Sequence, residues 1–149
     1  MSPNIRRATV ADHNTITTFN IQIALETEDV KLDPKIASQG VAALLEDSAK
    51  GRYYVLEEDG RIAAQLMITF EWSDWRNGQL WWIQSVYVHA DYRRRGFFRA
   101  LYQHVAQEAK QENAVGIRLY VDTHNTKAQE TYKAMGMSSH YTVFEDVWV

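Results

Sequence analysis

The sequence predicts an α/β fold in which a mixed, mostly antiparallel sheet carries helices on both faces. Short apolar runs typical of strands are separated by stretches whose apolar residues recur every three or four positions, as in helices. The 149 residues are 46% hydrophobic and 23% charged, which is an ordinary globular composition. No repeat, low-complexity tract or Gly/Pro-rich linker divides the chain. We therefore expect one domain over residues 1–149.

The first half of the chain is expected to form a strand, two helices and three further strands. Residues 5–9 read as the first strand, and a helix follows to about residue 25. After an acidic loop, Glu26 to Asp29, a second helix opens at Asp33-Pro34, because proline is tolerated in a first turn. The tight turn Glu58-Asp59-Gly60 then joins two strands. The three strands are expected over residues 52–57, 61–72 and 79–88.

The second half is expected to alternate helices and strands. An apolar helical stripe runs from Phe97 to about residue 113, and residues 117–122 form an apolar strand. A last helix over 125–135 is closed by Gly136 as a C-cap. Residues 141–149 are expected to be a final strand. The predicted order is β-α-α-β-β-β-α-β-α-β.

Composition excludes several classes of function. A net charge of −3 argues against general nucleic-acid binding, and the absence of cysteine excludes a thiolate metal site and a cysteine nucleophile. We predict no metal site. The first residues lack the apolar core of a signal peptide, and no apolar run is long enough to cross a bilayer. We expect a cytoplasmic protein that does not contact membranes.

The most informative segment follows the strand 79–88. Three arginines, Arg93, Arg94 and Arg95, precede Gly96 and a helix on which Arg99 comes early. A helix start offers free N–H groups and partial positive charge, glycine permits close approach, and guanidinium groups suit phosphate. This pattern favours a pyrophosphate site. The alternative is a solvated arginine face followed by an ordinary turn.

A second segment of interest begins the last helix. Asn125 stands where an N-cap belongs, and Ala128 and Tyr132 share one helix face because they are four residues apart. By themselves these residues could be only a cap and a packing tyrosine. They indicate a function only when they are considered together with the arginine segment.

Together the two segments resemble the GCN5-related N-acetyltransferase (GNAT) family. That family carries a Gln/Arg-x-x-Gly-x-Gly/Ala signature after its fourth strand and an Asn-x-x-Ala-x-x-x-Tyr-x-x-x-Gly pattern on its penultimate helix. The chain matches the first from Arg93 and the second from Asn125 through Gly136. Phe98 departs from the pattern, since the family usually has glycine or alanine there. Its side chain must turn into the core or onto the cofactor.

The resemblance implies a GNAT-like fold and acetyl-CoA as the cosubstrate. In this family the fourth strand bulges away from the fifth, and the pantetheine arm lies in the gap. Backbone N–H groups from Arg94 to Phe98 would bind the pyrophosphate, and Asn125 and Ala128 would contact the arm. The implied cofactor-binding residues are Val86, Tyr87, Val88, Arg93, Arg94, Arg95, Gly96, Phe97, Phe98, Asn125, Ala128 and Tyr132.

The resemblance also implies catalytic roles. Tyr132 matches the tyrosine that protonates the departing CoA thiolate, and a phenol of pKa about 10 is protonated at neutral pH. Some branches place a glutamate base on the fourth strand, but Trp82 stands at that position here. The candidates for a base are Glu26, Glu28, Glu71, His89 or a chain of water molecules. We favour Glu26.

For the acceptor we expect a small amine (or a peptide) that is cationic and partly apolar. Trp82 and Gln84 have the same strand parity as Val86, so we expect them to approach the acceptor cleft, with Glu28 nearby. The main hypothesis is an N-acetyltransferase; the alternative is a CoA-binding sensor or partner-binding module without transferase activity. Val147-Trp148-Val149 either completes the sheet or lies at a homodimer interface, and we favour the first.

Overall fold

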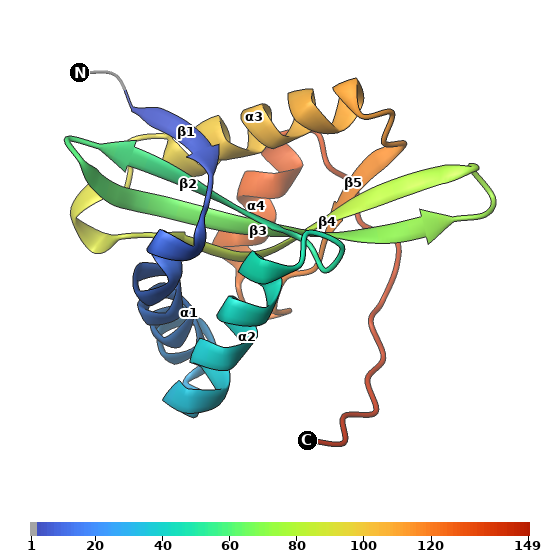
Figure 1. Ribbon diagram of the computed structural model, residues 1–149. Helices are drawn as coiled ribbons and strands as arrows, with labels where there is room; N and C mark the ends of the chain where they lie inside the picture. The colour runs from blue at the N-terminus through green and yellow to red at the C-terminus, as the bar shows by residue number, and fades with distance from the viewer. Residues whose placement is uncertain (1–2) are drawn as a thin grey trace. The chain divides into compact units, whose positions relative to one another are not determined.

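The computed structural model describes residues 3–149, and it confirms the predicted α/β fold. The chain forms two compact units, one ending at Arg118 and one beginning at Leu119. The single domain predicted over residues 1–149 stays a prediction. The order of elements agrees with the sequence from the first strand to the last helix (Figure 1). The elements are β1 (Asn4–Arg7), α1 (His13–Glu28), α2 (Pro34–Glu46), β2 (Arg52–Glu58), β3 (Arg61–Ser73), β4 (Gly78–Val88), α3 (Phe97–Gln111), β5 (Gly116–Leu119) and α4 (Thr126–Ala134), with 3-10 turns at Val10–Asp12 and Ala90–Tyr92.

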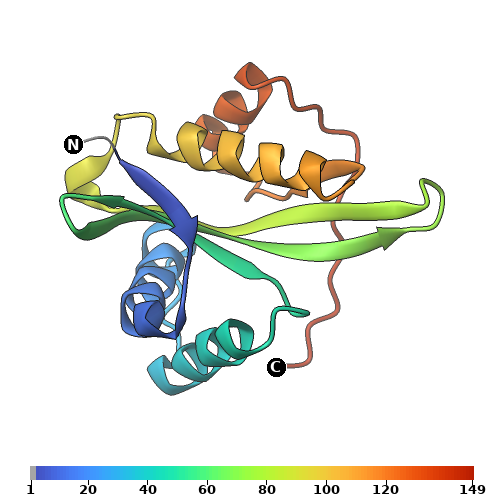
Figure 2. The same ribbon diagram turned by 45° about the horizontal axis from the view of Figure 1, so that its top comes forward.

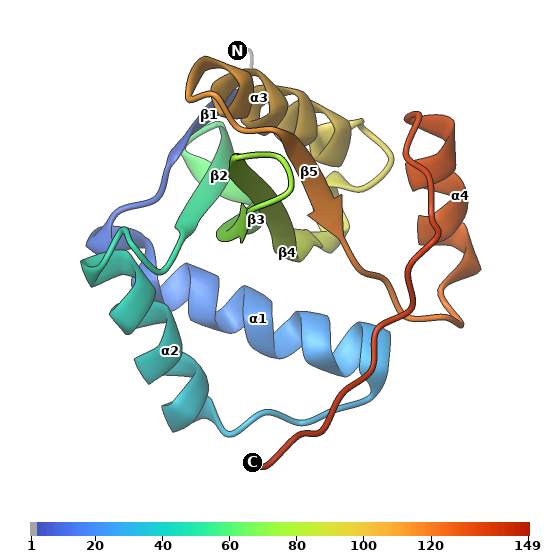
Figure 3. The same ribbon diagram turned by 90° about the vertical axis from the view of Figure 1, so that its right-hand side faces the viewer.

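The five strands form one sheet in the order β1-β2-β3-β4-β5. The pairs β1–β2, β2–β3 and β3–β4 are antiparallel. Helices α1 and α2 cover one face of this sheet and α3 covers the other, which Figure 2 shows from the side and Figure 3 from the end of the strands. The predicted coverage of both faces is therefore confirmed.

Each face of the sheet has its own layer of buried side chains. Under α1 and α2, a cluster forms from Ile16, Val41, Leu44 and Tyr53. On the opposite face, the apolar stripe of α3 is buried as its spacing predicted. That stripe consists of Phe97, Leu101, Val105 and Ala109.

Helix α1 is longer than the sequence suggested. It continues to Glu28 and is closed by Asp29, which has a left-handed backbone (φ 53°). Aspartate tolerates this conformation better than most residues, so it can serve as a C-cap where glycine is more usual. Glu26 and Glu28 therefore stand on the last turn of a helix, and the prediction of an acidic loop there was wrong.

The predicted final strand over 141–149 is not formed. Residues 138–149 have no regular secondary structure, and all of them are exposed. Alternating apolar residues give a segment β-propensity, but a strand exists only where another strand accepts its hydrogen bonds. That residues 147–149 complete the sheet, or lie at a homodimer interface, stays a prediction. No helix within residues 3–149 is long and apolar enough to cross a membrane.

Candidate functional site

Strand β4 carries a β-bulge near its end. Gln84 pairs with Met67 and Tyr87 pairs with Gln65, so Leu66 stands opposite two residues of β4. The first of these, Ser85, has a left-handed backbone with φ 52°. Such a conformation is uncommon for a residue with a side chain and is typical of functional segments. The bulge falls directly before the predicted pantetheine strand, Val86 to Val88.

A buried polar network holds the bulge. Gln65 is fully buried, and its Nε2 donates to the main-chain oxygen of Ser85 (3.1 Å) and to Oδ1 of Asn20 on α1 (2.8 Å). Asn20 in turn donates to the hydroxyl of Tyr53 at 3.1 Å. The bulge takes the Ser85 oxygen out of the regular ladder, and the side chain of Gln65 supplies a donor for it. Sequence reasoning missed this residue.

The bulge also overturns one sequence inference. Met67 packs on the cluster under α1 and α2, and the ring centroid of Tyr87 lies 4.9 Å from that of Phe19 on α1. Gln84 and Tyr87 therefore face the same side although they are three residues apart, because the extra residue reverses the alternation. The argument that Trp82, Gln84 and Val86 share one face because they alternate along the strand was therefore wrong.

Trp82 and Gln84 nevertheless lie on the face that α1 and α2 partly cover. Gln84 Nε2 donates to the hydroxyl of Thr69 (2.8 Å), and Trp82 Nε1 donates to Oε1 of Glu71 (2.6 Å). Arg118 on β5 also pairs with Glu71, at 3.1 Å. The indole and the guanidinium lower the pKa of Glu71, which makes this carboxylate a weaker proton acceptor.

The turn after β4 has the geometry of an anion cradle. Arg94 (φ 65°) and Gly96 (φ 75°) both have left-handed backbones, and Gly96 is the N-cap of α3. Alternation of left-handed with other conformations turns successive N–H groups toward one side. A Cβ added at Gly96 would meet no heavy atom within 4 Å, so the approach to the start of α3 is open.

The arginines of this turn divide into two groups. Arg93 Nη2 pairs with Glu26 (2.8 Å) and Arg93 Nε donates to the Val88 oxygen (2.9 Å). Arg95 forms a two-point pair with Glu58. Arg94 and Arg99 are exposed, and among residues 3–149 neither has an ion-pair partner. These two have guanidinium groups available for an anion.

The two phenylalanines that follow Gly96 behave differently. Phe97 is buried beneath α3, whereas Phe98 is half-buried and its ring centroid lies 6.2 Å from that of Tyr102. Tyr102 is one helical turn further along α3. The side chain of Phe98, which departs from the family pattern, thus packs along its own helix, and its backbone N–H stays in the first turn.

Glu26 joins the end of α1 to the turn after β4. Its carboxylate binds Arg93 and also hydrogen-bonds the hydroxyl of Tyr87. The Arg93 guanidinium, followed by the Tyr87 hydroxyl, lowers the pKa of Glu26. Burial and the contact with Glu26 raise the pKa of Tyr87. Glu28 is exposed, and no ion pair with it occurs in the described part of the chain.

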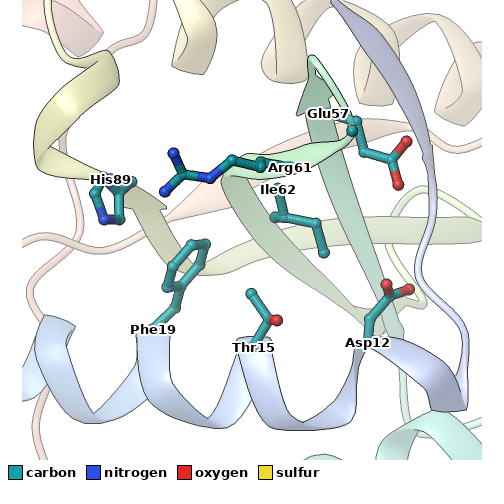
Figure 4. A pocket seen from close by; sticks show the side chains of 8 residues that line it. Asp12, Thr15, Phe19, Glu57, Arg61, Ile62 and His89 are labelled. Carbon is teal, nitrogen blue, oxygen red and sulfur yellow. The ribbon is translucent and has the colours of Figure 1, made fainter.

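His89 faces a pocket of about 400 Å³ that sequence reasoning did not foresee (Figure 4). The pocket lies between α1 and the β2–β3 hairpin, with Thr15 and Phe19 on one side and Arg61 on the other. Asp12 and Glu57 also line it, and both bind Arg6. His89 Nδ1 accepts the Asp91 N–H at 3.1 Å, which fixes the ring at the pocket edge.

The second unit contains the other predicted residues. Asn125 caps α4 by accepting the N–H of Ala128 through its side-chain oxygen (3.2 Å), as expected. Gly136 has φ 93° and follows the helix, which fits the predicted C-cap. Tyr132 is half-buried, and burial raises the pKa of its phenol. This hydroxyl is therefore protonated at neutral pH.

Comparison with known proteins agrees with this geometry. The model of the acetyltransferase (GNAT) family matches residues 19–137. The crystal structure of a possible acetyltransferase from Clostridium difficile 630 is 42% identical, with a TM-score of 0.92 over 100% of this chain and 99% of that chain. The comparison with curated proteins gave no match.

Two more distant structures share the fold. A predicted acetyltransferase with acetyl-CoA from Clostridium acetobutylicum is 19% identical, with a TM-score of 0.81 over 98% of this chain and 96% of that chain. A ribosomal-protein-alanine N-acetyltransferase from Brucella melitensis biovar Abortus 2308 is 14% identical, with a TM-score of 0.82 over 99% and 100%. The family model and the 42% identical structure establish that this chain belongs to the GNAT acetyltransferase family.

Proposed function

We propose that the protein transfers the acetyl group of acetyl-CoA to a primary amine of a small molecule or peptide, by direct attack of the amine on the thioester. The observation that carries this proposal is the sequence of features along one strand and turn. A bulge at Ser85 is followed within eleven residues by a turn with left-handed Arg94 and Gly96 and then by a helix start. A main-chain edge for an extended arm and a cradle for a pyrophosphate thus follow one another.

The residues of the turn fit acetyl-CoA in chemistry. Arg94 and Arg99 would pair with phosphate oxygens, and the N–H groups from Arg94 to Phe98 would donate to them. Arg93 and Arg95 are held by Glu26 and Glu58, so their contribution would be to fix the turn. The main chain of Val86, Tyr87 and Val88 would bind the pantetheine arm, and Asn125 and Ala128 would border it.

Direct transfer forms a C–N bond and breaks a C–S bond, so the chain must accept one proton from the amine and donate one to the departing sulfur. Acetyl-CoA supplies an activated acyl group. Tyr132 is the proposed proton donor, and its raised pKa keeps the phenol protonated across the neutral range. A chain without cysteine has no thiol to form an acyl-enzyme, which agrees with direct attack.

Glu26 is the proposed proton acceptor. Its carboxylate is half-exposed at the end of α1 and hydrogen-bonds Tyr87, a residue of the proposed pantetheine strand. Because Arg93 lowers its pKa, Glu26 is ionised at neutral pH but is a weaker base than an ordinary glutamate. Glu28, Trp82 and Gln84 are the proposed contacts for a cationic, partly apolar amine. We place this activity in the cytoplasm.

The experiment is an assay of thiol release from acetyl-CoA across polyamines, amino acids, aminoglycosides and peptides, with calorimetry of CoA binding beside it. Because the chain has no cysteine, every thiol detected comes from released CoA. Tyr132→Phe is the matched variant, and it should lower kcat about 10²-fold or more while leaving CoA affinity unchanged. Equal kcat in the variant would exclude Tyr132 as the proton donor.

The same experiment separates the enzyme from the alternative. Tight CoA binding without turnover on any amine would support a CoA-binding sensor or partner-binding module. Failure to bind CoA would contradict the assignment of the turn 93–96 as a pyrophosphate site.

A further inference from the structure

The pocket of about 400 Å³ between α1 and the β2–β3 hairpin has no role in the proposed acetyl transfer. Among residues 3–149, those that line it include none that we propose to bind acetyl-CoA or the amine. Its volume lies within the roughly 300–1,000 Å³ of small-molecule sites. Phe19 on α1 and Ile62 on β3 form an apolar wall (Figure 4). Ring contacts with Tyr87 (4.9 Å between centroids) and His89 (6.3 Å) hold Phe19, so this wall is a packed side chain.

Two hydrogen-bond donors meet at one end of the pocket. In Figure 4 the guanidinium of Arg61 points toward His89. Its Cζ lies 5.9 Å from the ring centroid of Tyr92, and within residues 3–149 the side chain of Arg61 forms no ion pair or hydrogen bond. Because Nδ1 of His89 accepts the Asp91 N–H (3.1 Å), the neutral imidazole has its proton on Nε2 and donates there. A guanidinium and an imidazole N–H together suit a carboxylate.

The opposite end of the pocket carries negative charge (Figure 4). Asp12 and Glu57 share one cation, Arg6, so two carboxylates and one guanidinium leave a net charge of −1. Asp12 uses both of its carboxylate oxygens on Arg6, whereas Arg6 reaches Glu57 only through Oε1. Oε2 of Glu57 can therefore still accept a hydrogen bond from a cation. With Arg61 at the other end, the pocket is neutral in total but has a positive and a negative end.

We propose that this pocket binds a small zwitterion, whose carboxylate is held by Arg61 and His89 and whose ammonium group lies at Glu57. The carbon atoms between the two charges would lie against Phe19 and Ile62. A phosphate fits less well, because its two negative charges would enter a pocket whose own charges cancel. The class of ligand is that of ω-amino acids and dipeptides, in which the two charged groups are several atoms apart.

Calorimetry of the full chain with 5-aminopentanoate, and with ω-amino acids of three to seven carbon atoms, tests the proposal. At least one should bind with a Kd on the order of 1 mM, as expected for about eight non-hydrogen atoms. The carboxylic acid and the amine of the same length each lack one charged group, so both should bind at least about 10-fold more weakly. Equal binding of the three compounds, or no binding of any ω-amino acid up to about 20 mM, would overturn the proposal.

Two arginine variants locate the binding. Arg61→Gln removes the positive end of the pocket and should lower the affinity at least about 10-fold. Because Arg61 is exposed, we expect this variant to keep its fold, which thermal unfolding checks. Arg94→Gln is the matched control, since Arg94 is an exposed arginine of the pyrophosphate turn. A loss of affinity in Arg94→Gln but not in Arg61→Gln would place the zwitterion at that turn and contradict the proposal.

Nuclear magnetic resonance of the imidazole signals gives an independent readout of the same pocket. Addition of the ω-amino acid should shift the signals of His89 in the wild type and leave those of His104, which lies on α3, unchanged. Unshifted His89 signals at saturation would mean that the ligand binds elsewhere. These measurements use no acetyl-CoA, so their outcome does not depend on the proposed acetyl transfer.

Discussion

The side-chain amide of Gln65 donates a hydrogen bond to the main-chain oxygen of Ser85, across 3.1 Å, at the point where β4 bulges. Gln65 comes from β3, and it also binds Asn20 of α1, so three elements meet at one buried amide. The Ser85 oxygen and Asn20 Oδ1 both accept hydrogen bonds, so the NH₂ group of Gln65 points toward them. The position of the proposed pantetheine strand thus depends on a residue that would not touch acetyl-CoA.

Replacing Gln65 by methionine keeps the length of the side chain and removes the donor. The Ser85 oxygen and Asn20 then lose a hydrogen bond in a buried place, so the free energy of unfolding should fall by about 1–3 kcal/mol. Urea denaturation measures this change. The control is Gln84→Met, whose partner is the Thr69 hydroxyl, a group that can rotate to another partner. An equal loss in both variants would show that the bulge has no special dependence on Gln65.

Two glycines with almost the same backbone allow the proposed anion cradle to be tested. Gly60 (φ 77°) and Gly96 (φ 75°) are both left-handed, and a Cβ at either would meet no heavy atom within 4 Å. Alanine at each should destabilise the fold by about 1–2 kcal/mol through backbone strain alone. Only Gly96→Ala should also weaken CoA binding, because its Cβ occupies the approach to the start of α3. Calorimetry measures the CoA affinity of both variants. Equal affinities in Gly60→Ala and Gly96→Ala would contradict the proposed anion cradle.

Glu26 and Glu28 lie on the same helical turn, and only Glu26 is paired with an arginine. If Glu26 accepts the proton, Glu26→Gln should lower kcat about 10²–10⁴-fold. Since Arg93 lowers the pKa of Glu26, its deprotonated form persists as the pH falls below the ordinary range near 4.3, and the acidic limb of the rate profile should lie there. Glu28→Gln should instead raise KM for cationic amines a few-fold. An unchanged kcat in Glu26→Gln would favour water as the acceptor.

The ion pair between Arg6 on β1 and Asp12 should make the free energy of unfolding depend on pH. Asp12 is buried, and it binds both Nη atoms of Arg6 (2.8 and 2.9 Å) and the N–H of Thr9 (2.7 Å). The hydrogen bond from Arg6 is the main reason that the pKa of Asp12 is lowered. Its contribution to stability is complete above the unfolded pKa of about 3.9 and is lost as the pH falls through the folded pKa.

Asp12→Asn should therefore lower the free energy of unfolding by about 1.5–3 kcal/mol at pH 7 and make the acid limb of stability shallower. Thermal unfolding between pH 2 and 7 follows both effects. Asp47→Asn removes an exposed carboxylate that pairs with Lys50, and it should change the profile little. If stability falls with acid equally steeply in the wild type and in Asp12→Asn, Asp12 is not the source of the pH dependence.

The elements were predictable because their signals are local. The stripe of α3, the caps Asn125 and Gly136 and the turn at Gly60 each follow from a few adjacent residues, and the structure has them where the sequence placed them. The end of α1 was misplaced because aspartate at position 29 takes the left-handed role that glycine usually signals.

The site was less predictable because it depends on residues far apart in the sequence. Arg93 reads as a phosphate ligand from its neighbours, yet its partner Glu26 is 67 residues away. The family resemblance implied a bulge in this strand, but no glycine marks Ser85 as its position, so the argument from the shared parity of Trp82 and Val86 did not allow for the extra residue. The segment 141–149 has the alternating apolar residues of a strand, but this pattern does not say which other strand it would pair with.

The extra residue in β4 also limits how the length of this chain can change in evolution. The connection over residues 74–77 is an exposed turn, where an inserted residue would leave both strands in register. Deleting Ser85 would restore strict alternation with Tyr87 still opposite Gln65, but it would remove the bulge and the main-chain oxygen to which the Gln65 amide donates. Among relatives, insertions and deletions should therefore gather at 74–77 and avoid the stretch from 79 to 88.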